Sequence, residues 1–163
     1  MARIVVLSDT HARSLEQLPA AMLEAAKEAD AVVHCGDYTG IEVLEGLQKL
    51  AREFIGVPGN TDPPEIRRDL PSKTVFTFQG RKIGVIHPVW GGPPFGIEEE
   101  VRRQFEAVDA ILFGHTHEPC SQWLRGILFL NPGQGYTSFR VPATYATLDI
   151  GERGLEGQIV TLG

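Results

Sequence analysis

Short apolar runs alternate with segments of helical spacing over roughly the first sixty residues of the chain. The runs at 3–7, 31–34 and 53–57 are rich in aliphatic and β-branched residues, which is typical of strands buried on both faces. Between these runs, apolar residues recur every three or four positions, and S/T-x-x-E/Q patterns at 14–17 and 39–42 predict where two helices begin. The order strand, helix, strand, helix, strand predicts an α/β fold with a parallel sheet and right-handed crossovers.

The second half of the chain is richer in short strands. Polar and apolar residues alternate at 74–78 and an apolar run covers 82–86, and the Gly-Arg turn between these two segments predicts a hairpin. Apolar residues at helical spacing from 97 to 108 predict one further helix. The expected strands in this half cover 74–78, 82–86, 110–113, 121–124, 127–130, 144–150 and 155–162. The sequence has no internal repeat or linker, so we expect one domain over residues 1–163.

Composition narrows the class of protein. The chain has 163 residues, a net charge of -6 and no block of Lys and Arg, which argues against an extended nucleic-acid surface. No apolar stretch approaches the roughly 20 residues of a membrane span, and the apolar run near the N-terminus is too short for a signal peptide. We therefore expect a cytoplasmic protein without a membrane partner. Cys35 and Cys120 lack the spacing of a disulfide framework, and Cys35 lies in an apolar run that predicts a core position.

Polar residues follow the predicted strands at their carboxyl ends. Gly114-His115-Thr116-His117 follows the apolar run 110–113, and residues two apart in an extended segment point to the same side, so the two histidines can address one small volume. Ligands in parallel α/β sheets gather at the carboxyl ends of strands. The polar residues at these ends form one set of seven candidate ligands: Asp9, His11, Asp37, Asn60, His87, His115 and His117.

The chemistry of this set predicts a metal centre. It offers oxygen and imidazole nitrogen but no thiolate, which favours a pair of divalent first-row ions over a structural zinc. Seven residues can serve two ions if one carboxylate bridges them. Two ions roughly 3.5–4 Å apart polarise a phosphoryl group and ionise a water at neutral pH, which yields a hydroxide aimed at phosphorus.

Taken singly, each of the seven has an ordinary structural explanation, such as a turn cap, a turn residue after glycine, a solvated loop histidine or a core histidine. Their joint occurrence at strand ends is what favours a site. Two neighbours are assigned no role: His34 lies within a predicted strand, and Thr116 lies between two candidate ligands.

The sequence resembles the calcineurin-like metallophosphoesterases, and within them the small single-domain phosphodiesterases. Five motifs in order carry the resemblance: Asp-x-His at 9–11, Gly-Asp at 36–37, Gly-Asn-x-Asp at 59–62, His87, and Gly-His-x-His at 114–117. An Asn-Pro-Gly turn at 131–133 is also similar. The resemblance implies a four-layer α/β/β/α sandwich, in which two mixed β-sheets lie face to face, flanked by helices, with the metal site at strand carboxyl ends.

The resemblance also implies a role for each candidate ligand. Asp9, His11 and His117 would hold the first ion, Asp37 would bridge, and Asn60, His87 and His115 would hold the second. Asp37, Asn60 and His115 are the residues expected to act in catalysis, with Asn60 near the phosphate. The expected activity is metal-dependent hydrolysis of small phosphodiesters or nucleotides. The ligand set and the resemblance favour two Mn²⁺ ions, while zinc, nickel and iron stay open.

Two departures from the family pattern affect the predicted chemistry. Many relatives have a histidine, thought to assist the leaving group, where this chain has Thr61. Threonine is no general acid near neutral pH, so we expect modest turnover and a preference for good leaving groups. Close relatives also have a second histidine two residues after the His87 position, where this chain has Val89. The loop 88–96 is therefore expected to shape the pocket differently.

Two other functions remain alternatives. One is a non-catalytic or weakly catalytic protein-interaction scaffold, similar to a retromer subunit with the same fold. The other is a phosphomonoesterase or protein phosphatase, which Thr61 and the short chain disfavour. Because every expected ligand position is filled, the enzyme is the preferred interpretation. The sequence leaves homo-oligomerisation open.

Overall fold

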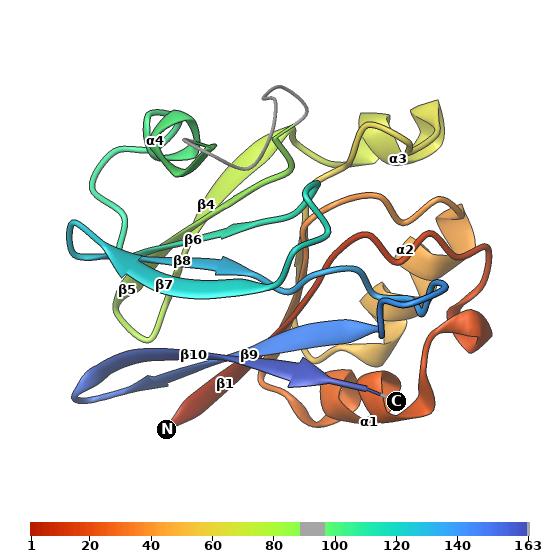
Figure 1. Ribbon diagram of the computed structural model, residues 1–163, viewed down its shortest axis with the longest axis horizontal. Helices are drawn as coiled ribbons and strands as arrows, with labels where there is room; N and C mark the ends of the chain where they lie inside the picture. The colour runs from red at the N-terminus through yellow and green to blue at the C-terminus, as the bar shows by residue number, and fades with distance from the viewer. Residues whose placement is uncertain (89–96, 163) are drawn as a thin grey trace.

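The computed structural model describes residues 1–88 and 97–162, and its ribbon shows two β-sheets with helices outside them (Figure 1). Within these residues the first sheet has five strands in the order β10-β9-β1-β2-β3. Their bounds are β1 (Ala2–Leu7), β2 (Ala31–His34), β3 (Phe54–Gly56), β9 (Thr144–Gly151) and β10 (Gly154–Thr161). β1, β2 and β3 are parallel, whereas β9 is antiparallel to both β1 and β10, so the sheet is mixed.

The second sheet has the order β4-β5-β6-β8-β7. Its strands are β4 (Lys73–Phe78), β5 (Arg81–Ile86), β6 (Ala110–Phe113), β7 (Cys120–Leu124) and β8 (Ile127–Asn131). β5, β6 and β8 are parallel, while β4 and β7 pair antiparallel at the two edges. Both sheets are therefore mixed, as expected from the resemblance.

The core has three layers of apolar side chains, because the central strands are buried on both faces. In β1, Ile4 and Val6 face the second sheet and pack in a cluster with residues such as Leu112, while Val5 and Leu7 face the helices. α1 (Ala20–Glu28) and α2 (Ile41–Leu50) cover the outer face of the first sheet, and α4 (Ile97–Arg102) covers part of the second. The four-layer α/β/β/α arrangement is confirmed (Figure 1).

Local structure departs from the predictions where proline intervenes. The predicted helix after position 14 is split into a 3-10 turn, η1 (Leu15–Gln17), and α1, because Pro19 lacks an N–H and holds Leu18 extended. Neither predicted capping box forms. Ser14 makes no side-chain cap, and the side chain of Gln17 instead accepts a hydrogen bond from the backbone N–H of Arg13.

The second predicted helix start was also misplaced, since α2 begins at Ile41 after Gly40. A helix was missed at α3 (Pro64–Asp69), where proline at the first helical position was interpreted as a turn. α4 is shorter than predicted, although Phe105 and Val108 still pack beside it.

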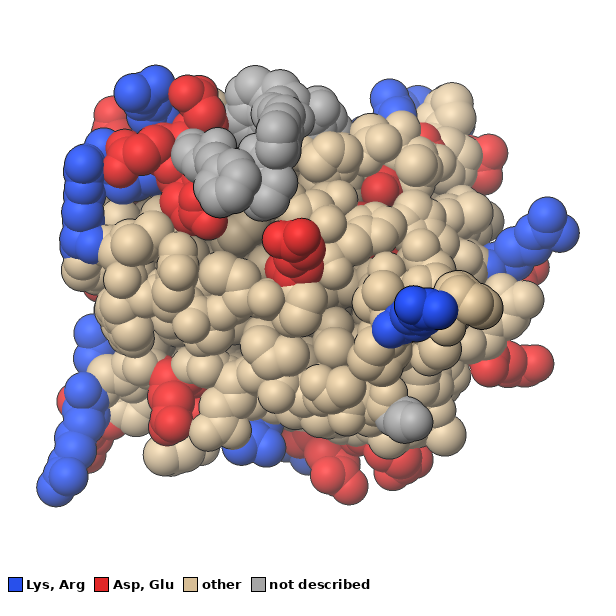
Figure 2. Space-filling model, in the orientation of Figure 1, with Lys and Arg blue, Asp and Glu red and all other residues tan. Residues whose placement is uncertain are grey.

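Surface charge is dispersed on the face shown in Figure 2. Lys and Arg lie scattered around its edge together with Asp and Glu, and its centre carries few charged side chains. Among the described residues, no helix is both long and apolar enough to cross a membrane. Of the loop expected to reshape the pocket, 88–96, only Pro88 falls within the described residues.

Candidate metal centre

The candidate ligands lie on turns with unusual backbone angles. Five of them have positive φ: Asp9 (51°), His11 (44°), Asp37 (63°), His115 (80°) and His117 (63°). Left-handed backbone costs roughly 1–3 kcal/mol at a non-glycine residue and persists where the surrounding structure enforces it, most often at functional sites. The strain therefore agrees with a functional role for these turns.

Backbone hydrogen bonds and close packing hold the turns together. Beyond the ends of β1 and β2, the N–H of Asp9 donates to Gly36 O (2.9 Å) and the N–H of His11 donates to Asp37 O (3.1 Å). Gly114 lies so close to the first turn that a Cβ there would be 1.9 Å from Ser8 Oγ. The glycine that opens the His-Thr-His turn is thus required for the second sheet to approach the first.

The three residues predicted to hold the first ion are brought together. Ligand atoms of Asp9, His11 and His117 all lie within 4.8 Å of one another. His117 Nε2 is 3.2 Å from Asp9 Oδ1, and His11 Nε2 is 3.9 Å from the same oxygen. Within the described chain, Asp9 Oδ1 and His11 Nε2 are buried atoms without a hydrogen-bond partner. Such atoms are rare in folded proteins, and a cation between them would satisfy both.

Asp37 lies between the two groups of ligands. Its Oδ2 is 3.3 Å from His87 Nε2 and 3.7 Å from His11 Nε2, while its Oδ1 accepts a hydrogen bond from the N–H of Thr61 (2.9 Å). Ligand atoms of Asp9, Asp37 and His87 also lie within 4.8 Å of one another. Asp9 therefore takes part in both groups, and Asp37 Oδ2 lies within 4.0 Å of one histidine from each group.

His87 presents a lone pair to other acceptors. Its Nδ1 is 2.8 Å from Cys35 O, and a carbonyl only accepts, so Nδ1 carries the proton in the neutral ring. Its Nε2 then faces Asn60 Oδ1 at 2.9 Å as well as Asp37. Asn60 Oδ1 is also 3.2 Å from His115 Nδ1. Acceptors that converge in this way repel one another unless a proton or a cation lies between them.

The electrostatics of the site favour a cation. Across residues 1–88 and 97–162, the only Lys, Arg or His side-chain nitrogens within 4.0 Å of the Asp9 or Asp37 carboxylate oxygens belong to histidines. Burial raises the pKa of Asp37, but the nearby imidazole of His87 outweighs this effect and holds the pKa well below its usual range, so the carboxylate is ionised.

The histidines of the site respond to the same charges. Burial lowers the pKa of His87, but the nearby carboxylates of Asp37 and Asp9 outweigh this effect and raise the pKa above its ordinary value. The nearby carboxylate of Asp9 raises the pKa of His117, whereas burial and the charge of His87 lower the pKa of His115. A divalent ion would meet the same negative field that raises the pKa of His87.

Asp62 has a structural role that the sequence did not reveal. Its side chain is 3% exposed, and its Oδ2 accepts the N–H of Asp37 (2.9 Å) and of Gly59 (2.8 Å). Its Oδ1 accepts the N–H of Thr39 (2.9 Å). Asp62 therefore joins the turn after β2 to the turn after β3. The only sequence signal was its place at the end of the Gly-Asn-x-Asp motif.

Two further side chains support the turns. Arg67, on α3, donates to the carbonyl oxygens of Asn60 and Asp62. Asn131 donates to Thr116 Oγ1 (2.9 Å) and accepts the N–H of Gly133 (2.9 Å). The Asn-Pro-Gly turn is thus linked to the His-Thr-His turn by a hydrogen bond to Thr116, which gives Thr116 a structural role.

His34 is a structural histidine, in agreement with the prediction. Its Nδ1 accepts the N–H of Gly36 (3.0 Å), its Nε2 lies 3.0 Å from Thr10 Oγ1, and its ring stacks on Tyr38 at 3.8 Å. Complete burial lowers the pKa of His34 to about 3, so the ring is neutral. Cys35 is fully buried as expected, and burial raises the pKa of its thiol.

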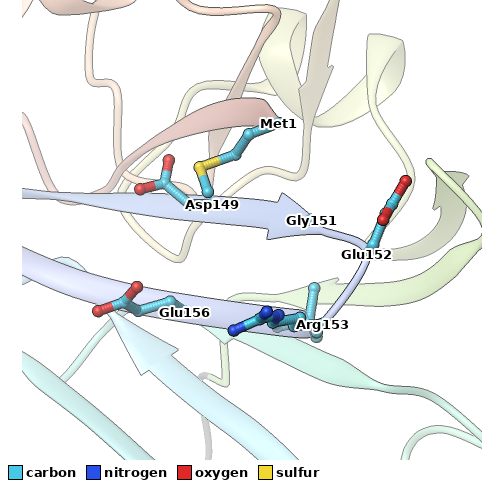
Figure 3. Close-up of a pocket in the computed structure, with 8 residues that line it drawn as sticks. Met1, Asp149, Gly151, Glu152, Arg153 and Glu156 are labelled. Carbon is cyan, nitrogen blue, oxygen red and sulfur yellow. The ribbon is translucent and has the colours of Figure 1, made fainter.

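Two hollows differ in their relation to the candidate ligands. One, of about 290 Å³, lies beside Asn60 and is lined also by Arg67 and Leu70. A larger one, of about 450 Å³, lies at the β9–β10 turn, where Met1, Asp149 and other residues surround it (Figure 3). The end of β9 next to this turn pairs with the N-terminal end of β1. Because the candidate ligands follow the carboxyl ends of the strands, this hollow is at the opposite end of the sheet.

Comparison with known proteins agrees with this geometry. The family model described as the calcineurin-like phosphoesterase superfamily domain matches residues 2–153. A probable metallophosphoesterase of Methanocaldococcus jannaschii is 37% identical over 136 residues, which cover 80% of this chain and 66%, just under two thirds, of that relative. A phosphodiesterase of the same organism is 22% identical over 143 residues, which cover 81% of this chain and 83% of that protein.

A solved structure has the same fold. The solution NMR structure of a Thermotoga maritima protein matches 99% of this chain and 100% of that chain, with a TM-score of 0.76 and 34% sequence identity. Fold, turn geometry, motif order and these similarities agree, and the chain belongs to the calcineurin-like phosphoesterase superfamily.

Proposed function

We propose that the protein is a metal-dependent phosphodiesterase that hydrolyses small phosphodiesters or nucleotides with the aid of two divalent ions. One observation carries the proposal: the buried carboxylates of Asp9 and Asp37 face imidazole nitrogens, with no Lys or Arg paired to them among the described residues. The phosphodiesterase relative supports the reaction class. The proposed ligands are Asp9, His11 and His117 for one ion, Asn60, His87 and His115 for the other, and Asp37 as the bridge.

The side chains around the proposed ions have separate roles in hydrolysis. When bound, two such ions supply positive charge that polarises a phosphoryl group and lowers the pKa of water to near neutrality. Asn60 directs its amide oxygen toward His87 and His115, which leaves its amide nitrogen free to donate to a phosphoryl oxygen. The N–H of Thr61 is occupied by Asp37, and its hydroxyl cannot act as a general acid near neutral pH. Esters with good leaving groups are therefore the preferred substrates.

Manganese is the proposed ion. Carboxylate, amide and imidazole ligands suit it, and none of the proposed ligands is a thiolate. The test of this choice is turnover of metal-stripped protein loaded in parallel with Mn²⁺, Zn²⁺, Ni²⁺ or Fe²⁺, with the bound ions counted in each sample. Higher turnover per bound ion with zinc than with manganese would overturn the choice of metal and leave the reaction class intact.

The central experiment is a metal titration of one sample. Metal-stripped protein is titrated with Mn²⁺ and assayed on bis(p-nitrophenyl) phosphate beside p-nitrophenyl phosphate. We expect cleavage of the diester to depend on metal and to saturate near two ions per chain, with slower cleavage of the monoester. Two tightly bound ions without turnover of either ester would contradict the proposal.

A protein-interaction scaffold is the second candidate, favoured by one feature of the surface. On the edge strand β7, the consecutive residues Trp123 and Leu124 are 53% and 39% exposed. Consecutive side chains of a strand point to opposite faces, so this edge strand exposes one apolar side chain on each face, beside unpaired backbone groups to which a partner can bind. Two bound ions without turnover in the titration would shift the preference to this function.

A further inference from the structure

The segment between β8 and β9 places an aromatic ring against the first group of ligands. The Tyr136 ring lies 5.5 Å from the ring of His11 and 6.2 Å from that of His117, measured between centroids, and is nearly perpendicular to both (84° and 89°). Tyr136 is half-buried and belongs to none of the three apolar clusters formed by the described residues. Its ring is therefore part of the site rather than of the core.

Hydrogen bonds fix the backbone that carries this ring. The N–H of Gly135 is shared between Ser8 O (3.0 Å) and Asp9 O (3.1 Å), which ties the segment to the turn that carries Asp9. A Cβ at Gly135 would lie 2.7 Å from Thr10 Cγ2, so glycine permits this close approach. Gln134 is 5% exposed, and its amide nitrogen donates to Tyr136 O (2.8 Å) and Ser138 Oγ (3.0 Å).

A ring in this position can select substrates. A phosphodiester carries two organic substituents, and one that extends over His11 and His117 meets the ring of Tyr136. Aromatic rings pair favourably with other aromatic groups, including nucleobases, and need no hydrogen bonding for this contact. Because these hydrogen bonds hold the backbone at Gly135 and Tyr136, the contact requires little further ordering of the backbone when substrate binds.

We propose that Tyr136 is a specificity-determining residue whose ring contacts an aromatic group, such as a nucleobase, on the substituent of the diester that does not leave. The inference rests on the proposed phosphodiesterase function and deepens it by naming a substrate class. It assigns the contact to the ring of Tyr136 and not to its hydroxyl group.

Two esters with the same leaving group test the inference. The Mn²⁺-loaded protein is assayed on thymidine 5′-(p-nitrophenyl phosphate) and on methyl p-nitrophenyl phosphate, as the parent and as the variants Tyr136→Ala and Tyr136→Phe. We expect Tyr136→Ala to raise KM for the thymidine ester about 2- to 10-fold, with kcat and the methyl ester little affected. Tyr136→Phe should behave as the parent on both esters.

Phe139 provides a matched control from the same segment. Phe139 is 93% exposed, and the guanidinium of the neighbouring Arg140 lies over its ring. Phe139→Ala should therefore leave KM for both esters unchanged. An equal loss on the thymidine ester in Phe139→Ala and Tyr136→Ala would show a general effect of the segment and would overturn the specific assignment.

A binding measurement separates this inference from the proposed activity. Calorimetry compares thymidine 5′-monophosphate with inorganic phosphate on the parent and on Tyr136→Ala, with bound Mn²⁺ counted in each. Weaker binding of the nucleotide alone supports the inference. Loss of ions, equal weakening of both ligands, or a Tyr136→Phe variant that resembles Tyr136→Ala would overturn it. Turnover of neither ester by the loaded parent would overturn the phosphodiesterase function, while the binding comparison would still decide whether Tyr136 contacts the aromatic group.

Discussion

Asp62 is the residue whose replacement tests most directly how the site is held together. Its carboxylate accepts three backbone N–H groups, from Asp37, Gly59 and Thr39, at 2.8–2.9 Å. Asp62→Ala leaves these three donors without their acceptor, and a buried donor without a partner costs about 1–3 kcal/mol. Burial raises the pKa of Asp62 despite these bonds, so the ionised group is itself disfavoured there and part of the cost is recovered when it is removed.

The structure predicts a graded response to two substitutions. Asp62→Ala should lower the free energy of unfolding by about 3–5 kcal/mol, because three buried N–H donors lose their acceptor and only part of this cost is recovered with the charge. In Asp62→Asn, the amide oxygen can replace Oδ2 and keep two donors, while the amide nitrogen faces the N–H of Thr39. One donor is then unsatisfied, and the expected loss is about 1–3 kcal/mol.

Urea unfolding of the metal-free protein measures these differences, and ion counting after dialysis shows their effect on the site. We expect weaker binding of one ion in both variants, because Asp62 joins the turns that carry Asp37 and Asn60. Asp69→Ala is the matched control, since it removes an exposed carboxylate from the end of α3 and should change stability by less than about 0.5 kcal/mol. Reasoning from the three hydrogen bonds would be refuted by an Asp62→Ala variant as stable as Asp69→Ala.

Three further predictions concern the ions, the leaving group and acid stability. Asp37→Asn should weaken binding of at least one ion by more than about 100-fold and abolish turnover, and two ions retained after dialysis would contradict the bridging role. Thr61→His should raise the rate on esters with poor leaving groups, by at most about 10²–10⁴-fold, and no gain across a leaving-group series would show that proton donation is not the limitation. The pKa of His34 is lowered to about 3 in the folded state. Between pH 6.5 and pH 3 the unfolded state therefore binds a proton that the folded state does not, and the free energy of unfolding decreases as the pH is lowered. The fall should reach about 1.4 kcal/mol per pH unit from this group, and urea unfolding at pH 7 and pH 5 should show a shallower loss for His34→Asn than for the parent.

The strands, and their succession along the chain, follow from local patterns in the sequence. The runs that became β1, β2 and β6 are continuous and apolar because these strands are buried on both faces, and such runs are recognisable without knowledge of their neighbours. Helix boundaries were less predictable. α3 begins at Pro64, and the sequence pattern there suits a turn as well as the first turn of a helix.

The candidate ligands could be identified because they follow strand ends at motif spacing, and chemistry limits what such a set can bind. Their roles toward two separate ions stay predictions, although the structure brings Asp9, His11 and His117 into one group and Asp37 and His87 into contact. By contrast, Asp62 and Tyr136 could not be assigned from sequence. The partners of Asp62 lie up to 25 residues away, and His11 is 125 positions before Tyr136 in the chain.

The sequence by itself determined the strands, the parallel arrangement of the first three of them and the ligand chemistry, because each depends on residue type and short-range spacing. Only the tertiary structure decided which atoms face one another. The two sheets pack face to face through side chains distant in sequence, and this packing brings the turns after β5 and β6 onto those after β1 and β2. The left-handed turns after β1 and β2 are held by hydrogen bonds to one another, and the buried oxygen of Asp9 without a donor and the ring beside His11 and His117 depend on contacts between segments distant in the sequence.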